Sequence, residues 1–225
     1  MSDRTVKWSC AAAIEDGHDD NDDTTKTIGI PARRMRLTIL HALFVLVVTA
    51  ANAGAQSAPL PPDDPFAAHR WHFEFDGSAA FEAWNYNGSH EELYGLGESL
   101  SYGLIDGLTL RMGQRFIYVS QRSEDAVVLG LTIGLRRRFH QRGRLSAFLQ
   151  GDLGITYTAI AAPPRGTRFN YLATGGGGVM VKTGGRAHVV TTVYVMHLSN
   201  ASVKGPGRNP DIESLGGSLG LLLRF

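Results

Sequence analysis

Hydrophobic residues recur at every second position along most of the chain after residue 70. In residues 127–135, valine, leucine and isoleucine fill all five odd positions, and glycine or threonine fills three of the four even ones. Residues 145–155 alternate in the same way, with serine, glutamine and aspartate opposite the apolar face. A period of two is typical of β-strands with one apolar and one polar face. The pattern therefore predicts an all-β fold.

Most of the alternating segments are long enough to cross a membrane, because a tilted transmembrane strand needs about 9–11 residues. Tight connections ("IDG", "HQRG", "TGG") alternate with longer ones. Together these features predict an eight-stranded antiparallel transmembrane β-barrel of the bacterial outer membrane over residues 70–225, with both termini on the periplasmic side. The strands are expected at residues 71–84, 92–104, 107–119, 125–139, 143–157, 170–183, 186–199 and 213–225.

The last residues favour the same fold. Leucines alternate up to a terminal Phe225, an arrangement that resembles the final strand of bacterial outer-membrane proteins. A soluble β-sandwich would also alternate, but it does not explain the strand length and this chain end together. The register of residues 92–104 is left open, because Glu98 shares the parity of the outward Tyr94 and Leu96. Charged residues on the polar faces are expected to pair inside a narrow barrel: Glu74, Asp76, Arg111, Arg115, Asp152, Lys182 and Arg224.

The segment before the barrel resembles a secretory signal. Arginines precede the apolar run of residues 37–51, which ends in two A-x-A motifs, and Met35 stands where a signal peptide should start. Residues 35–55 are therefore interpreted as the signal peptide. A membrane anchor helix is the alternative, although the run is short for one. Residues 1–34 are acidic and apolar-poor, and are interpreted as a disordered gene-model extension. Residues 56–69 form a Pro-rich, extended lead-in.

Composition restricts the function classes. The chain has 22 basic and 21 acidic residues and a net charge of +1, so no basic surface for nucleic acid is indicated. Its only cysteine is Cys10, so neither an internal disulfide nor a cysteine metal site can form. His69 and His72 lie three residues apart near the start of a strand with no evident third ligand, and we predict neither a metal nor a cofactor.

Three polar residues near the end of the chain occupy alternate positions that are expected to face outward. His197 and Ser199 continue the apolar face of the seventh segment, and Glu213 begins that of the eighth. Consecutive antiparallel strands place them at one rim, where a serine nucleophile, a histidine base and an orienting acid could meet. Asp211 is a rival acid, but Glu213 is preferred because it begins a strand.

The stretches "HLSNA" and "NPDIES" resemble the active-site segment of bacterial outer-membrane lipid A 3-O-deacylases, also called acyloxyacyl hydrolases. The resemblance implies an esterase that removes the ester-linked acyl chain at position 3 of lipid A, with lipopolysaccharide as substrate. His197 would be the base, Ser199 the nucleophile and Glu213 the acid, and Asn200 and Asn209 would orient groups or stabilise an oxyanion. Asp211 departs from the glycine expected after Asn-Pro.

Other functions remain open at this point. A non-enzymatic structural or adhesion barrel would carry the same rim residues incidentally. A different lipid-modifying barrel, such as a phospholipase or an acyltransferase, is a third alternative. A homodimer is also compatible with the sequence.

The signal-peptide interpretation predicts cleavage after Ala53 or Ala55, because both end an A-x-A motif behind the apolar run. N-terminal sequencing of the outer-membrane form should therefore give a first residue at 54 or 56. A membrane-inserted product that begins at Met1 would refute the interpretation.

Overall fold

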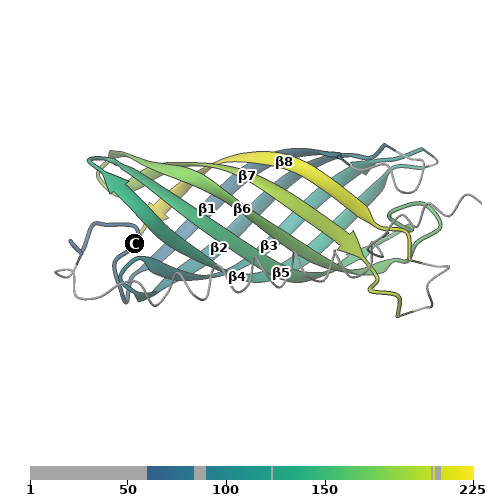
Figure 1. Ribbon diagram of the computed structural model, residues 1–225, viewed down its shortest axis with the longest axis horizontal. Coiled ribbons are helices and arrows are strands. Elements are labelled where there is room, and N and C mark those ends of the chain that lie inside the picture. Colours follow the sequence, from purple (N-terminus) through teal and green to yellow (C-terminus); the bar gives the residue numbers. More distant parts are fainter. Residues whose placement is uncertain (1–59, 84–89, 123, 204, 206–208) are drawn as a thin grey trace, which may run out of the picture.

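The chain forms a closed barrel of eight antiparallel strands, each paired with the next along the sequence, and β1 pairs with β8 to close the ring (Figure 1). The computed structural model describes residues 60–83, 90–122, 124–203, 205 and 209–225. The proposed extension and signal peptide, and the first part of the lead-in, lie outside these residues. The strands are β1 Trp71–Glu82, β2 Glu92–Ile105, β3 Leu108–Ser120, β4 Ala126–Arg142, β5 Leu145–Thr158, β6 Phe169–Gly184, β7 Ala187–Ser199 and β8 Ile212–Arg224.

The predicted fold class and strand order are confirmed. The largest difference in strand bounds is at β4, which continues to Arg142 because its hairpin with β5 keeps pairing as far as Leu145. The tight turns and the C-terminus lie at one end of the barrel, here called the turn end, and the longer connections gather at the other, the loop end (Figure 1). In barrels of this type the turn end is periplasmic and the loop end extracellular.

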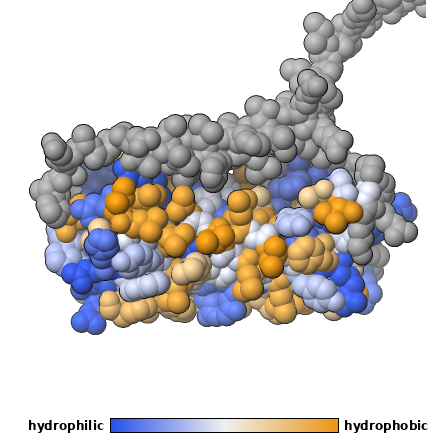
Figure 2. All heavy atoms as spheres, turned by 90° about the horizontal axis from the view of Figure 1, so that it is seen from below, coloured by the Kyte–Doolittle hydropathy of each residue, from blue (hydrophilic) through white to orange (hydrophobic). Residues whose placement is uncertain are grey.

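The outer wall is apolar between polar ends (Figure 2). Large hydrophobic side chains such as Leu131, Leu153 and Leu219 are more than half exposed on it, as expected of a lipid-facing belt. No helix among the described residues is long and apolar enough to cross a membrane.

The open register of the second strand is now resolved. Glu98 does face outward with Leu96 and Leu100, and lies directly opposite Gln114 of β3. The Gln114 side-chain amide donates a hydrogen bond to the Glu98 carboxylate. An outward acid is thus tolerated in β2 because its neighbouring strand supplies a donor.

Buried ion pairs join the strands across the middle of the interior. Arg136 of β4 donates two hydrogen bonds to Glu74 of β1, at 2.6 and 3.0 Å, and also bonds Gln150 of β5. Arg111 of β3 lies 2.9 Å from Asp152 of β5 and 3.4 Å from Glu74. These side chains are almost fully buried, so each charge depends on its partner. The predicted interior pairing is confirmed for Glu74, Asp76, Arg111, Arg115 and Asp152, whereas the role of Arg136 was not anticipated. Lys182 and Arg224 instead bind residues 60–69, through Asp63 and the Pro62 carbonyl.

Apolar layers fill the barrel on either side of these ion pairs. The layer at the loop end contains Ala80, Leu93, Ile117, Leu198 and Ile212, among others. The layer at the turn end contains Phe66, Phe148, Met180, Val190 and Leu222. The interior of the barrel is therefore packed with side chains, as expected for eight strands.

The lead-in is folded against the turn end, where an extended segment was expected. Residues 60–69 form successive turns that bury Phe66 against Phe148, with ring centroids 6.4 Å apart. Asp64 forms an ion pair with Arg138 at 2.7 Å. Asp106, in the β2–β3 turn, accepts hydrogen bonds from the backbone N–H groups of Ala68 and Leu60, and these bonds lower its pKa. The segment thus covers the turn end of the barrel.

Glycines in β6 allow close packing of the neighbouring strand. A Cβ atom added at Gly176 or Gly178 would lie 2.1 Å from a backbone oxygen of β7, at Val193 or Thr191. Such a contact would require the backbone to move. The "GGGG" stretch is therefore a packing feature at these two inward positions.

Glu74→Ala should lower the free energy of unfolding by about 3–5 kcal/mol, because it leaves the buried Arg136 guanidinium without its carboxylate. Urea titration of the barrel refolded in detergent measures the change. Glu92→Ala is the matched control, since Glu92 is exposed at the loop end, and should stay within about 0.5 kcal/mol of the parent. Equal unfolding midpoints for the two variants would contradict the prediction.

Candidate active site

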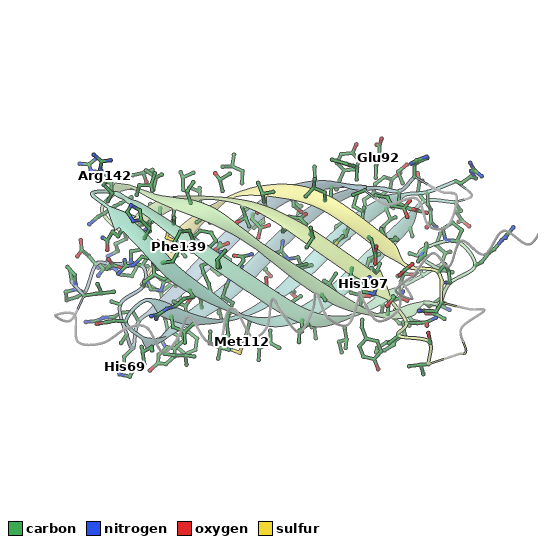
Figure 3. The ribbon with its side chains drawn as sticks, in the orientation of Figure 1. His69, Glu92, Met112, Phe139, Arg142 and His197 are labelled. Carbon is green, nitrogen blue, oxygen red and sulfur yellow. The ribbon has the colours of Figure 1, made fainter. Side chains whose placement is uncertain are left out.

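The candidate site lies at the loop end, where β7 ends and β8 begins (Figure 1). His197 is directly opposite Glu213 in the β7–β8 ladder, and Ser199 is the last residue of β7. Residues two apart on a strand project from the same side, so Ser199 and His197 share one face. Figure 3 shows His197 at the end of the barrel far from His69 and Arg142, which lie at the turn end. The predicted rim position therefore agrees with the structure.

Ser199 and His197 form a hydrogen bond. The Ser199 Oγ and His197 Nε2 atoms are 2.8 Å apart. Ser199 is 4% exposed, whereas the His197 side chain is 29% exposed. The imidazole can accept the serine proton when Nδ1 carries the ring hydrogen, which is the arrangement of an activated serine nucleophile.

Two carboxylates face the other nitrogen of the imidazole. Oε1 of Glu213 lies 3.6 Å from His197 Nδ1, and Oδ2 of Asp211 lies 3.9 Å from it. Both distances exceed an ordinary hydrogen bond of about 2.7–3.2 Å. Asp211 is the more deeply buried of the two. Sequence parity favoured Glu213 because Asp211 precedes the strand, but the loop brings the Asp211 carboxylate almost as close.

The chain turns tightly directly after Ser199. Ala201 and Ser202 have φ values of 52° and 62°, in the left-handed region that non-glycine residues seldom adopt. The Ala201 backbone N–H points at Ser199 Oγ, at 3.4 Å. Asn209 accepts a hydrogen bond from the Asn200 N–H through Oδ1, at 3.0 Å, which directs its amide NH₂ group away from Asn200. The two asparagines thus connect the two sides of the loop.

Residues of β6 complete the surroundings. Tyr171 of β6 is opposite Ser199 in the ladder, and Ala173 is opposite His197. The ring of Phe169 packs edge-on against Tyr171, with centroids 5.5 Å apart. Neither this aromatic pair nor the Ala201 N–H was identified from the sequence. Tyr171 could have been found by aligning β6 against β7, but the N–H direction depends on loop dihedral angles.

The site also has the composition of a metal cluster. One ligand atom each from His197, Asp211 and Glu213 lies within 4.8 Å of the others, and this is the only such group among the described residues. With a metal on Nδ1, the Nε2–H group would donate to Ser199 Oγ as an outer-sphere bond. With the ring hydrogen on Nδ1, Nε2 would instead be free to accept the serine proton.

Solved structures resemble the chain in fold. Neisserial surface protein A (NspA) is 12% identical, with a TM-score of 0.51, over 69% of this chain and 97% of that protein. The outer-membrane enzyme PagL is 21% identical, with a TM-score of 0.47, over 67% and 99%. OprG from Pseudomonas aeruginosa is 12% identical, with a TM-score of 0.46, over 70% and 98%.

No protein-family model matches the sequence, and no curated protein matches it. The assignment therefore comes from the fold. The closed eight-stranded ring, its apolar outer belt and its similarity to NspA identify the chain as a small β-barrel of the bacterial outer membrane.

Proposed function

We propose that the protein is an outer-membrane esterase that hydrolyses the ester-linked acyl chain at position 3 of lipid A. The observation that carries the proposal is the 2.8 Å hydrogen bond between Ser199 Oγ and His197 Nε2, with two carboxylates on the far side of the imidazole. A structural barrel has no need for this arrangement, whereas a serine esterase requires it. The sequence resemblance of "HLSNA" and "NPDIES" to lipid A 3-O-deacylases supplies the substrate class.

The chemistry follows from the geometry. Ser199 Oγ attacks the ester carbonyl carbon while His197 Nε2 takes the hydroxyl proton. The ester C–O bond then breaks, and the sugar oxygen leaves with that proton. Water attacks the acyl-serine in the second half of the reaction, with His197 again as base, and releases the fatty acid. A carboxylate beside Nδ1 holds the imidazole in the required tautomer and stabilises the imidazolium.

Hydrogen-bond donors around Ser199 would stabilise the tetrahedral oxyanion. The Ala201 N–H already lies next to Ser199 Oγ. Asn209 uses its Oδ1 atom to accept the Asn200 N–H, so its NH₂ group remains a candidate donor to the oxyanion. Donors held in place before the reaction are worth far more than donors that must reorganise. The left-handed turn at Ala201 is thus a functional feature in this proposal, because it directs an N–H at the nucleophile.

The outward position of the site suits a substrate that stays in the membrane. Beneath His197, β6 presents Ala173 and then Gly175 and Gly177 at the outward positions of the wall. The small side chains at Ala173 and Gly175 would leave room for an acyl chain to lie along the barrel while its ester is at Ser199, whereas the Leu149 side chain partly fills the space at Gly177. Tyr171 and Phe169 flank the same position at the rim.

Removal of either member of the Ser–His pair should nearly abolish activity. Ser199→Ala and His197→Ala should each lower deacylation by about 10³–10⁶-fold, and the double variant should be little worse than either, because the two residues act as a unit. Mass spectrometry of lipid A from cells that express each variant measures the loss of the acyl chain. Ser202→Ala is the matched control, since this serine lies three residues on in the same loop.

All variants should insert as normal barrels, because the substituted side chains lie at the rim. A Ser199→Ala barrel that still removes the acyl chain at the parental rate would dismiss the nucleophile assignment. If the parent itself leaves lipid A unchanged while other lipids are cleaved, the protein is a different lipid hydrolase. If no lipid is cleaved at all, the alternative of a non-enzymatic barrel is correct.

The two acids should differ in effect. Glu213→Gln keeps the side-chain shape but removes the charge opposite His197 in the ladder, so turnover should fall by about 10²–10⁴-fold with little change in folding. Asp211→Asn should cost less than about tenfold, because Asp211 lies farther from Nδ1. Rates in the reverse order would assign the orienting role to Asp211.

A further inference from the structure

Three buried oxygen-bearing side chains form a row on the inner wall at the loop end, on the other side of the sheet from the candidate active site. Glu82 is the last residue of β1, and its N–H donates to the Glu91 carbonyl oxygen at 2.8 Å, beside β2. Ser214 of β8 is opposite Glu82 in the ladder. The exposed fractions are 8% for Glu82, 1% for Glu91 and 0% for Ser214. The row therefore crosses three adjacent strands inside the barrel.

Both oxygens of Glu82, both oxygens of Glu91 and the Ser214 Oγ are buried without a partner among the described residues. Glu91 and the buried Asp211 are the negative charges that act on the Glu82 carboxyl group. Deeper in the barrel the buried acids are paired with bases, since Glu74, Asp76 and Asp152 each have an arginine partner. The Glu82–Glu91 pair is thus a buried acidic pair without an arginine.

The surroundings make an uncompensated charge costly. The neighbouring inward-facing residues of the same strands are Ala80 and Leu93, deeper in the barrel, and Ile212, nearer the rim, all part of the apolar layer. Burying an ionised carboxylate in such surroundings is strongly unfavourable unless it is neutralised. A shared proton would connect only one oxygen of each carboxylate and would leave Ser214 Oγ and two carboxylate oxygens unsatisfied. A cation could satisfy all of them.

We infer that Glu82, Glu91 and Ser214 form a binding site for a divalent cation, of the hard, oxygen-preferring kind represented by Ca²⁺. Two carboxylates and a hydroxyl provide up to five oxygen ligands, and Ca²⁺ takes 6–8, with water or backbone carbonyls as the remainder. The two negative charges balance the charge of the ion. The site is distinct from the His197, Asp211 and Glu213 group, because Ser214 faces inward where its neighbour Glu213 faces outward.

Occupancy of this inner site would stabilise the strand end that carries Glu213. The Ala83 N–H donates to the Glu213 carbonyl oxygen at 2.9 Å, so the residue after Glu82 is already bonded to the residue before Ser214. An ion that bridges β1, β2 and β8 from inside holds the same backbone from the opposite side. The inference does not depend on the esterase activity.

The test uses the purified barrel, refolded in detergent without lipopolysaccharide, and unfolded by heat in EDTA or in millimolar CaCl₂. With Ca²⁺ about 100-fold above its dissociation constant, the unfolding temperature should rise by about 5–10 °C. Equilibrium dialysis should give one tightly bound ion per chain. Glu82→Gln combined with Glu91→Gln should remove both effects, and Ser214→Ala, a milder change, should weaken binding while the barrel still folds.

Two further variants locate the ion. Glu92→Gln, next to Glu91 but exposed on the outer side, should leave the Ca²⁺ effect unchanged. Glu213→Gln should also retain it. The inference is overturned if the parent unfolds at the same temperature in EDTA and in CaCl₂, the result expected of a carboxyl pair that shares a proton. It is equally overturned if Glu213→Gln abolishes the Ca²⁺ effect while the Glu82/Glu91 double variant retains it, since the ion would then lie at the outer group.

Discussion

The unbroken ring of backbone hydrogen bonds is the constraint on which the rest of this structure depends. A bilayer offers no water to satisfy N–H and C=O groups, so the strands can span it only if β1 also pairs with β8. Closure with eight strands leaves an interior just wide enough for side chains. Every strand must then present one side to lipid and the other to a narrow interior. Consecutive residues at a strand end therefore lie on opposite faces, as Glu213 and Ser214 do.

The parts of the fold that follow from local periodicity could be predicted from the sequence. Alternation indicated which side of each strand faces lipid, and strand bounds followed within a few residues because turn and loop segments interrupt the pattern. The prediction was weakest where a polar residue breaks the alternation. Glu98 is an example, because its outward position depends on Gln114 of the next strand, and a single-strand pattern contains no information about that neighbour.

Features that depend on closure in three dimensions could not be predicted in this way. The ion pair between Glu74 and Arg136 joins residues 62 positions apart across the interior. The lead-in was expected to be extended, yet Phe66 is buried at the turn end because the barrel supplies an apolar layer there. In the candidate site, the alternation along the two strands predicted that His197, Ser199 and Glu213 lie at one rim. The proximity of Asp211 depends on the path of a loop, which periodicity does not describe.

The connectivity of the candidate site sets an order of events during assembly. Ser199 and His197 belong to β7 and can meet as soon as that strand is extended, whereas Glu213 belongs to β8, the final strand, and Asp211 to the loop just before it. The hydrogen-bonded pair therefore obtains an acid only when the last hairpin has formed. A chain whose β8 is not yet paired has the serine and the histidine but neither carboxylate beside the imidazole. The candidate site is thus complete only once β8 pairs with β7, and in the proposed mechanism a chain without that hairpin would lack its orienting acid.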